Sequence, residues 1–348
     1  MDKIGRYRIT GRIGSGSFAT VFRGHDESLD VPVAVKVLSP DWIHNPDVQE
    51  RFLSEARILR RLDDERIVRV YDIGTTPSGQ PYFVMDLADG GSLEQLRRRP
   101  VAPGLALRLA AEAARAVDVM HRNALVHRDV APGNILLRHT SSGARVLLAD
   151  LGVASSLVEA DQEDLTAGTP AYMAPQQASS TRPERSSDIY SLAAVTYALL
   201  TSRPPFPATS LADVLARDPG QGPLPIAAQL GAPEVLDQVL TASLSADPAQ
   251  RPATASQLAD ALDRLADQLP GGDELRPSRP APNEHIPDRR PPTEPTPGEM
   301  LDGYLGPGRY RPRPTKETYS PWFYVWLTGT AIVLAGLAAW ITIGFLLG

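Results

Sequence analysis

Hydrophobic and polar positions follow three different patterns along this chain. Residues 1–268 mix alternating apolar runs of strand length with stretches of helical period and short turn clusters. Over residues 269–320 that pattern stops and prolines become frequent, and residues 321–348 are apolar with no polar face. The pattern therefore predicts a folded domain, then a linker, then an apolar helix.

The proline-rich stretch 269–320 predicts an extended, disordered juxtamembrane linker. The 52 residues from Pro270 to Pro321 hold 13 prolines, and acidic and basic residues balance among them. Such a segment cannot bury enough apolar surface to offset its chain entropy. The pair Gly271 and Gly272 marks its expected start. A plain spacer and a docking segment for a proline-recognising partner are both compatible with this composition.

Residues 321–348 predict one transmembrane helix. As a helix, the stretch from Trp322 to Leu347 would be about 39 Å long, enough for a hydrocarbon core of about 30 Å. Basic residues between Arg309 and Lys316 precede it and none follows, so the positive-inside rule places the N-terminal region in the cytoplasm. We expect a single-pass protein of the cell membrane, with its C-terminus at or near the outer face and no extracytoplasmic domain.

The segment RIGSGSFATVFRG, residues 12–24, has the glycines of a phosphate-binding loop. Gly14 and Gly16 allow backbone N–H groups to approach a phosphate closely. β-forming residues follow, so the loop joins two strands. A Rossmann fingerprint would open a helix there, and a Walker loop needs a Gly-Lys-Ser/Thr sequence that the chain lacks. A glycine flap over a nucleotide remains, with an ordinary hairpin as the alternative.

A lysine inside the apolar run VPVAVKVL, residues 31–38, predicts a buried ion pair. The chain has only three lysines, and Lys36 lies where an unpaired ammonium would be costly. The helix that Asn45 and Pro46 predict to begin next carries Glu55 in the middle of its apolar stripe. We expect Glu55 to pair with Lys36; a glutamate–arginine pair elsewhere is the alternative.

In LVHRDVAPGNILL, residues 125–137, apolar runs that predict strands flank a short polar loop, and VLLADLG, residues 146–152, predicts a further strand. Asp129 and Asn134 lie in that loop, and Asp150 ends the further strand. Two carboxylates and an amide suit Mg²⁺, which takes oxygen ligands from protein and phosphate together. Asp129 is placed to accept a proton from an attacking hydroxyl.

Composition and charge exclude several other classes of protein. The net charge of −6 argues against a nucleic-acid binder that depends on phosphate neutralisation. The absence of cysteine excludes disulfides, thiolate zinc sites, iron–sulfur clusters and a cysteine nucleophile. The N-terminal sequence has no apolar region of a signal peptide.

Taken in order, these motifs resemble a eukaryotic-type (Hanks-type) serine/threonine protein kinase of the bacterial membrane-anchored kind. The resemblance also rests on VMDLADGGSL, GTPAYMAP, SDIYSL and DPAQRP. It implies an α+β bilobal kinase fold over residues 1–268, with a β-rich N-lobe over about 7–88 and a helical C-lobe over about 89–268. It also implies ATP and Mg²⁺ as cofactors, with Mn²⁺ as a substitute, and protein substrates.

The resemblance assigns a role to each matching residue. Asp129 would be the catalytic base, Glu55 would orient Lys36, and Asn134 and Asp150 would hold the metal. The nucleotide would be bound by Ile13, Gly14, Ser15, Gly16, Ser17, Phe18, Ala19, Thr20, Val21, Ala34, Lys36, Asp86, Ala88 and Leu136, with Met85 behind the pocket.

The resemblance also implies how the protein is regulated and what it contacts. Arg128 suggests an activation loop ordered by a phosphate, with Thr166 as the first candidate acceptor and Ser155 and Ser156 as the others. Residues 168–175 would seat the substrate hydroxyl. A homodimer through the kinase domain or the transmembrane helix, and the membrane itself, are the further expected partners.

Three positions depart from the family pattern. Ala131 replaces the usual catalytic-loop lysine, Leu151 replaces the phenylalanine of Asp-Phe-Gly, and Gln176 replaces a glutamate that would pair with Arg251. We expect Gln176 to form a neutral hydrogen bond with Arg251 instead. The departures leave open a nucleotide-binding pseudokinase scaffold, a small-molecule phosphotransferase and a membrane adaptor. The segment GTPAYMAP, which resembles a protein-substrate platform, argues against the small-molecule enzyme.

Overall fold

The computed structural model describes residues 3–140, 143–151, 170–179 and 184–272. All of them lie in one structural unit, residues 1–281. The three candidate phosphorylation sites, the linker beyond residue 272 and the expected transmembrane segment lie outside the described residues. Within those described ranges, no helix is both long and apolar enough to cross a bilayer.

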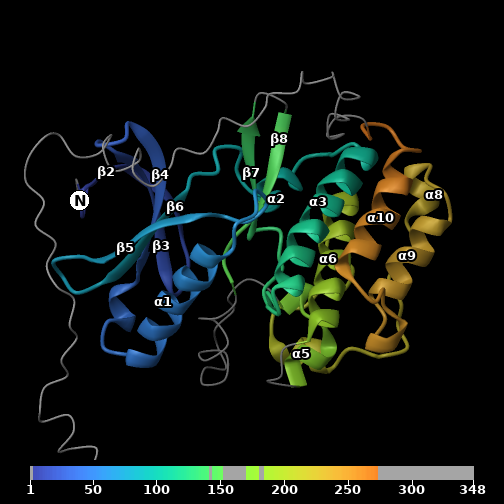
Figure 1. Cartoon of the computed structure of the whole chain (residues 1–348). Coiled ribbons are helices and arrows are strands. Elements are labelled where there is room, and N and C mark those ends of the chain that lie inside the picture. Colours follow the sequence, from blue (N-terminus) through green and yellow to red (C-terminus); the bar gives the residue numbers. More distant parts are fainter. Residues whose placement is uncertain (1–2, 141–142, 152–169, 180–183, 273–348) are drawn as a thin grey trace, which may run out of the picture. The chain divides into compact units, whose positions relative to one another are not determined.

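The N-terminal part is a six-stranded antiparallel sheet with one long helix, α1, packed against it (Figure 1). The sheet order is β1-β2-β3-β4-β6-β5. Its strands are β1 Lys3–Ile4, β2 Tyr7–Ser15, β3 Ala19–Asp26, β4 Val31–Leu38, β5 Val70–Thr75 and β6 Pro81–Asp86. The loop between β2 and β3 joins two strands, as the glycine motif predicted.

Helix α1, Pro46–Arg61, forms where the sequence signals predicted it. The side chain of Asn45 accepts hydrogen bonds from the first-turn amides, and Pro46 occupies a position whose N–H would have no helical partner. Phe52 is buried on its apolar face and stacks at 5.0 Å from Phe83 of β6. This packing fixes α1 against the sheet and brings its face toward β4.

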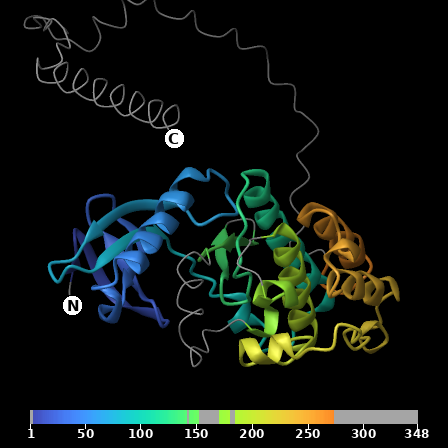
Figure 2. The same cartoon turned by 90° about the horizontal axis from the view of Figure 1, so that it is seen from below.

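The C-terminal part is a helical bundle, with α3 beside α6 and α10 against α3 (Figure 1 and Figure 2). The hairpin β7–β8 packs on α3 and carries the loops of the cleft. The elements are α2 Leu93–Leu96, α3 Pro103–Arg122, β7 Ile135–Thr140, β8 Gly143–Leu148, η2 Pro170–Tyr172, α5 Pro175–Ser179, α6 Arg185–Thr201, α7 Leu211–Leu215, α8 Ala227–Leu230, α9 Val235–Ser243 and α10 Ala255–Ala266. A β-rich lobe and a helical lobe confirm the bilobal fold.

The packed domain continues to Gly272, beyond the expected boundary at residue 268. The amide of Gly104 donates to Pro270 at 2.8 Å, and the buried guanidinium of Arg108 donates to the Gly272 carbonyl at 2.8 Å. A Cβ on Gly272 would lie 2.0 Å from the carbonyl oxygen of Ala266. Gly272 therefore belongs to the packed domain, where it allows a close chain crossing against α10, and does not mark the start of the linker as expected.

Candidate active site

A cleft of about 250 Å³ is lined by both lobes. The nucleotide-binding residues expected from the sequence that line it are Ile13, Gly14, Val21, Ala34, Asp86, Ala88 and Leu136. The expected residues Ser15, Gly16, Ser17, Phe18, Ala19, Thr20 and Lys36 do not line it. Met85, Leu87, Gly91, Ser92, Gln95, Gly133, Ala149 and Asp150 complete the wall. Its apolar strand residues and few polar groups suit a flat heteroaromatic ring.

The glycine loop covers one side of this cleft and leaves open space beside its backbone at Gly14. The amide of Gly16 donates to the carbonyl of Ala19 at 2.9 Å, which closes the turn. A Cβ at Gly14 would meet no heavy atom of the described residues within 4 Å. Glycine at position 14 is therefore not required by the protein's own packing, and the open space beside it suits a phosphate approaching the backbone.

Lys36 joins both lobes through two carboxylates. Its Nζ donates to Glu55 Oε1 at 2.9 Å and to Asp150 Oδ1 at 2.8 Å. Glu55 is 1% exposed, on the inner face of α1, and Lys36 is 9% exposed on β4. The ion pair expected from the strand and helix patterns is present, and Asp150 is a partner that those patterns did not indicate.

Lys36 and Glu55, the two buried members of this ion pair, change each other's pKa. Burial by itself lowers the pKa of Lys36, but Asp150 and Glu55 outweigh that effect and raise the pKa above its ordinary value. Burial raises the pKa of Glu55 above the usual carboxyl range, while Lys36 acts in the lowering direction. Lys36 therefore remains a cation and can bind the phosphate groups of a nucleotide.

The catalytic-loop residues Asp129 and Asn134 are in direct contact. The side-chain amide of Asn134 donates at 2.8 Å both to the backbone carbonyl of Asp129 and to its Oδ2. The amide of Ala149 donates to the backbone carbonyl of Asn134 at 2.9 Å, which brings the chain before Asp150 to the same place. The three polar residues therefore converge at one end of the β7–β8 hairpin. The expected strand before Asp129 is absent: Asp129 and Asn134 lie in the loop that precedes β7, and Asp150 follows β8.

Asp188 is a buried residue that holds the catalytic loop from α6. It is 1% exposed and accepts hydrogen bonds from the amides of His127 at 2.8 Å and Arg128 at 2.9 Å, and from the His121 ring at 2.8 Å. Sequence analysis named SDIYSL as a motif but gave Asp188 no role. Its position in the first turn of a helix, directly before a largely apolar run, was the signal that could have identified it.

The donor set fits the metal that the motifs imply. Because the amide nitrogen of Asn134 is occupied by Asp129, its oxygen is the atom suited to a cation. Asp150 has a second carboxylate oxygen besides the one bonded to Lys36. Asn134 and Asp150 would hold Mg²⁺ and leave the remaining positions to phosphate oxygens and water.

The structure places the three departures from the family pattern as follows. Ala131 is buried with 5% exposure, and so is Leu151, which keeps an apolar side chain in the core. Gln176 Oε1 accepts from Arg251 Nη2 at 2.9 Å, which confirms the expected neutral hydrogen bond. Burial lowers the pKa of Arg251 to about 10. Arg251 also donates to the carbonyls of Ser186 and Ser245, each at 2.9 Å.

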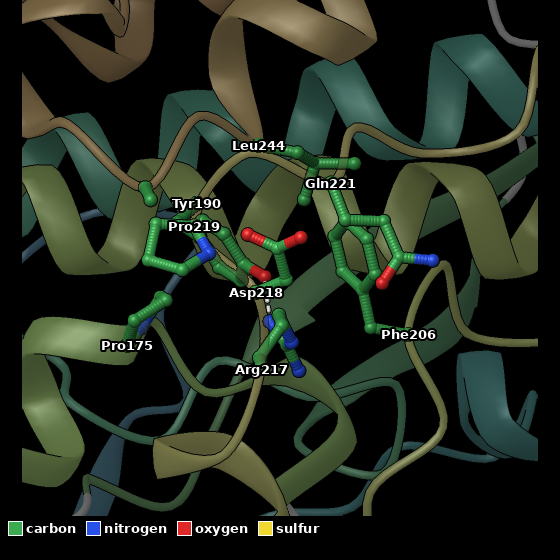
Figure 3. Close-up of a pocket in the computed structure, with 9 residues that line it drawn as sticks. Pro175, Tyr190, Phe206, Arg217, Asp218, Pro219, Gln221 and Leu244 are labelled. Atoms are coloured by element: carbon green, nitrogen blue, oxygen red, sulfur yellow. Dashed lines mark hydrogen bonds between the residues drawn. The ribbon is translucent and has the colours of Figure 1, made fainter.

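A second, much smaller pocket of about 20 Å³ lies beside α5 and α6 (Figure 3). Arg217 lies against the Phe206 ring, with the guanidinium carbon 4.4 Å from the ring centre, and donates to the Tyr190 hydroxyl. Asp218 lines the same pocket. That volume corresponds to about one water molecule, so this pocket cannot hold a nucleotide.

Comparison with known proteins places the domain in a family. A family model described as "Protein kinase domain" matches residues 7–261. Serine/threonine-protein kinase PknL of Mycobacterium tuberculosis is 34% identical over 269 residues, covering 76% of this chain and 66% of that protein. PknB of the same species is 34% identical over 270 residues, covering 75% and 43%. Pkn2 of Myxococcus xanthus is 34% identical over 268 residues, covering 74% and 32%.

Solved structures agree with this assignment. The M. tuberculosis PknI kinase domain aligns with a TM-score of 0.60 and 28% identity, covering 76% of this chain and 96% of that one. The chain spans only 32% to 66% of the length of the curated relatives described above, so the similarity concerns the catalytic domain. The chain belongs to the protein kinase family, and its domain is of the bacterial serine/threonine kinase type.

Proposed function

We propose that this protein transfers the γ-phosphate of ATP to serine and threonine hydroxyls of proteins, its own chain included. The observation that carries the proposal is the position of Lys36, which bonds Glu55 and Asp150 at the cleft. Asp129 lies nearby, held by Asn134. This arrangement supplies a cation for the phosphates, oxygen ligands for Mg²⁺ and a base for the hydroxyl.

In the proposed reaction the substrate hydroxyl oxygen forms a bond to the γ-phosphorus as the bond to the β–γ bridging oxygen breaks. Asp129 accepts the hydroxyl proton, and ADP leaves. Lys36, oriented by Glu55, holds the α- and β-phosphates. Mg²⁺ held by Asn134 and Asp150 would neutralise the phosphate charge. The protein's contribution is thus positioning and electrostatic stabilisation.

Incubation of the purified full-length chain with labelled ATP and Mg²⁺ tests this function. We expect label on serine and threonine of the chain and of a general acceptor protein, and loss of labelling when Mg²⁺ is chelated. A folded chain that binds ATP but transfers no phosphate would instead support the scaffold alternative, which the alanine at position 131 favours.

The proposed setting is the cytoplasmic side of the cell membrane. Its support is the apolar stretch 322–348 together with the basic residues between Arg309 and Lys316 that precede it. Ala331, Ala335 and Ala339 recur at four-residue spacing in that stretch, so a homodimer through close helix packing belongs to the same proposal. Confinement to a membrane would raise the effective concentration of neighbouring copies and favour phosphorylation in trans.

Fractionation with protease protection tests this location. We expect the chain in the membrane fraction, with its kinase domain digested only after the cytoplasmic side is opened. Recovery of the full-length chain as a soluble species, or digestion of the kinase domain from outside intact cells, would contradict it.

In the same preparations, mass spectrometry should find phosphate on Thr166, Ser155 or Ser156 if the activation loop is controlled as proposed.

A further inference from the structure

The peptide unit that joins Arg128 to Asp129 is bonded at both of its polar ends. Its carbonyl, that of Arg128, accepts a hydrogen bond from the side-chain amide of Gln177. Its N–H, that of Asp129, donates to His127 Nδ1 at 3.3 Å. A peptide unit is a rigid plane, so these two bonds set its orientation. Together with the bonds from Asn134 to the Asp129 carbonyl and Oδ2, that orientation restricts the direction in which the Asp129 side chain leaves the backbone.

Arg128 holds a backbone conformation that needs external support. Its φ of 70° lies in the left-handed region, which costs a non-glycine residue about 1–3 kcal/mol and persists only where neighbouring groups enforce it. Its N–H donates to Asp188 Oδ1 at 2.9 Å, from α6, and its carbonyl accepts from Gln177, on α5. Two helices therefore hold this one residue through its two backbone polar groups.

The amide of Gln177 can satisfy the Arg128 carbonyl in only one orientation. Its nitrogen donates and its oxygen cannot, so a flipped amide would bring two oxygens together. Gln177 Oε1 is buried and has no hydrogen-bond partner within the part of the chain that the structure describes. The contact with the catalytic loop therefore depends on the amide donor of Gln177.

Helix α5 is itself anchored, which gives Gln177 a fixed base. The neighbouring Gln176 accepts from Arg251 at 2.9 Å and donates to the hydroxyl of Ser187 at 3.3 Å, so it ties α5 to the interior of the C-lobe. The helix begins at Pro175, the last residue of the segment expected to seat the substrate hydroxyl. Gln177 thus connects that segment to the peptide before Asp129.

We propose that Gln177 is a positioning residue for the catalytic base. By holding the Arg128 carbonyl it keeps Asp129 aligned to accept the substrate proton, and it takes no part in nucleotide binding. This inference rests on the proposed kinase function. Because Gln177 does not line the nucleotide cleft, its loss should lower kcat and leave the affinity for ATP unchanged.

The full-length Gln177→Met variant tests this role, because methionine keeps the side-chain length and has no donor. We expect kcat for phosphorylation of dephosphorylated casein to fall about 10- to 100-fold, since a small misplacement of a catalytic group has that effect. KM for ATP should stay at the wild-type value. Gln268→Met is the matched control: Gln268 is exposed and donates to the carbonyl of Arg264 at 2.9 Å, and its loss should not change the kinetics.

The Gln177→Glu variant gives a readout that a purely structural role would not change. A protonated carboxyl can donate to the Arg128 carbonyl as glutamine does, whereas the ionised form offers only acceptors. Burial raises the pKa of a carboxyl in such a place. The kcat of Gln177→Glu relative to Gln177→Met should therefore rise as the pH is lowered from about 8 to about 6, where a carboxyl with a raised pKa takes up its proton.

A wild-type kcat in Gln177→Met would overturn the inference. It would also be overturned if kcat, ATP affinity and melting temperature fell together, or if the ratio of the two variants did not change with pH. An inactive wild-type chain would refute the proposed function and this inference with it. Activity in the wild type therefore separates failure of the inference from failure of the function.

Discussion

The two loops that meet at the nucleotide cleft are built in opposite ways. The glycine loop is exposed from Gly14 to Ser17, and a backbone bond of 2.9 Å from Gly16 to Ala19 closes its turn. Its side-chain bonds lie at exposed positions: the Trp42 ring donates to the Ser17 carbonyl at 3.0 Å, and the hydroxyls of Ser15 and Thr20 are 3.2 Å apart. The catalytic loop contains the fully buried His127 and is bonded by Asp188 from α6, by Gln177 from α5 and by Asn134 from within.

This difference matches the two tasks in the proposed reaction. A loop that binds phosphates can take its final contacts from the ligand, so few internal contacts are needed beforehand. A group that must accept a proton in the transition state has to be aligned before the reaction begins. The buried bonds of the catalytic loop provide that alignment, and they imply that substitutions there should affect kcat while those in the glycine loop affect ATP binding.

Loss of Lys36 should have a large effect on phosphotransfer, because this residue connects the two lobes. We expect Lys36→Met to lower phosphotransfer by at least about 10²–10³, the effect of removing one preorganised electrostatic group. The variant should also lose stability, because it leaves the Glu55 carboxylate buried without its cation, a change that costs about 3–5 kcal/mol. Uptake of a proton by Glu55, whose pKa burial already raises, offsets part of that cost. Unchanged autophosphorylation, measured at a temperature where both chains are folded, would contradict the assignment of Lys36.

Ala131→Lys should raise turnover by adding a phosphate contact to the catalytic loop. If the protein is a slow kinase, turnover should rise by up to about 10²-fold, the usual contribution of one such donor. Steady-state phosphorylation of casein by the two chains measures it. No gain, together with no detectable activity in the parent, would favour the pseudokinase scaffold.

Asp188→Asn should weaken the support of the catalytic loop from α6. The variant keeps one acceptor oxygen but replaces the other with a donor that faces the amides of His127 or Arg128, so we expect a loss of about 1–3 kcal/mol in unfolding free energy. The rate should fall about 10-fold as Asp129 loses alignment. Asp118→Asn, which removes only an ion pair with the exposed Arg122, is the control and should change stability by less than about 1 kcal/mol.

Gly14→Ala should have the smallest effect, confined to nucleotide binding. A Cβ there meets no heavy atom of the described residues within 4 Å, so the melting temperature should not fall. We expect KM for ATP to rise a few-fold, because the methyl group limits the approach of a phosphate to the backbone. Gly11→Ala, equally uncrowded on the same strand but outside the cleft lining, should match the wild type. An equal loss in both variants would contradict the assignment.

The parts of the site that sequence reasoning found are those with a local pattern. Lys36 interrupts an apolar strand and Glu55 interrupts an apolar helical stripe, and each needs a partner of opposite charge, so their pairing followed from burial alone. The helix that carries Glu55 was also marked by its cap at Asn45. Local signals of this kind predicted the strand–loop–strand unit of the glycine motif, helix α1 and the bounds of β4, but not β5 and β6.

The parts that were missed depend on contacts between distant segments. Asp188 bonds His127 across 61 residues, and Gln177 bonds Arg128 across 49. No periodic pattern in the sequence indicates which residues so far apart are in contact. The glycine pair misled for the same reason. The pair was expected to mark the start of the linker, whereas the close approach of Gly272 to α10 follows only from the folded arrangement of both segments.

The most direct test of the division between the two loops is Asp129→Asn, with ATP binding and phosphotransfer measured on the same full-length preparation. The side chain of Asp129 contacts Asn134 and the residue does not line the nucleotide cleft. We predict wild-type affinity for ATP and a loss of about 10²–10⁴ in transfer to serine and threonine, the contribution of a general base. Transfer at the wild-type rate, or loss of ATP affinity in parallel with activity, would contradict the account.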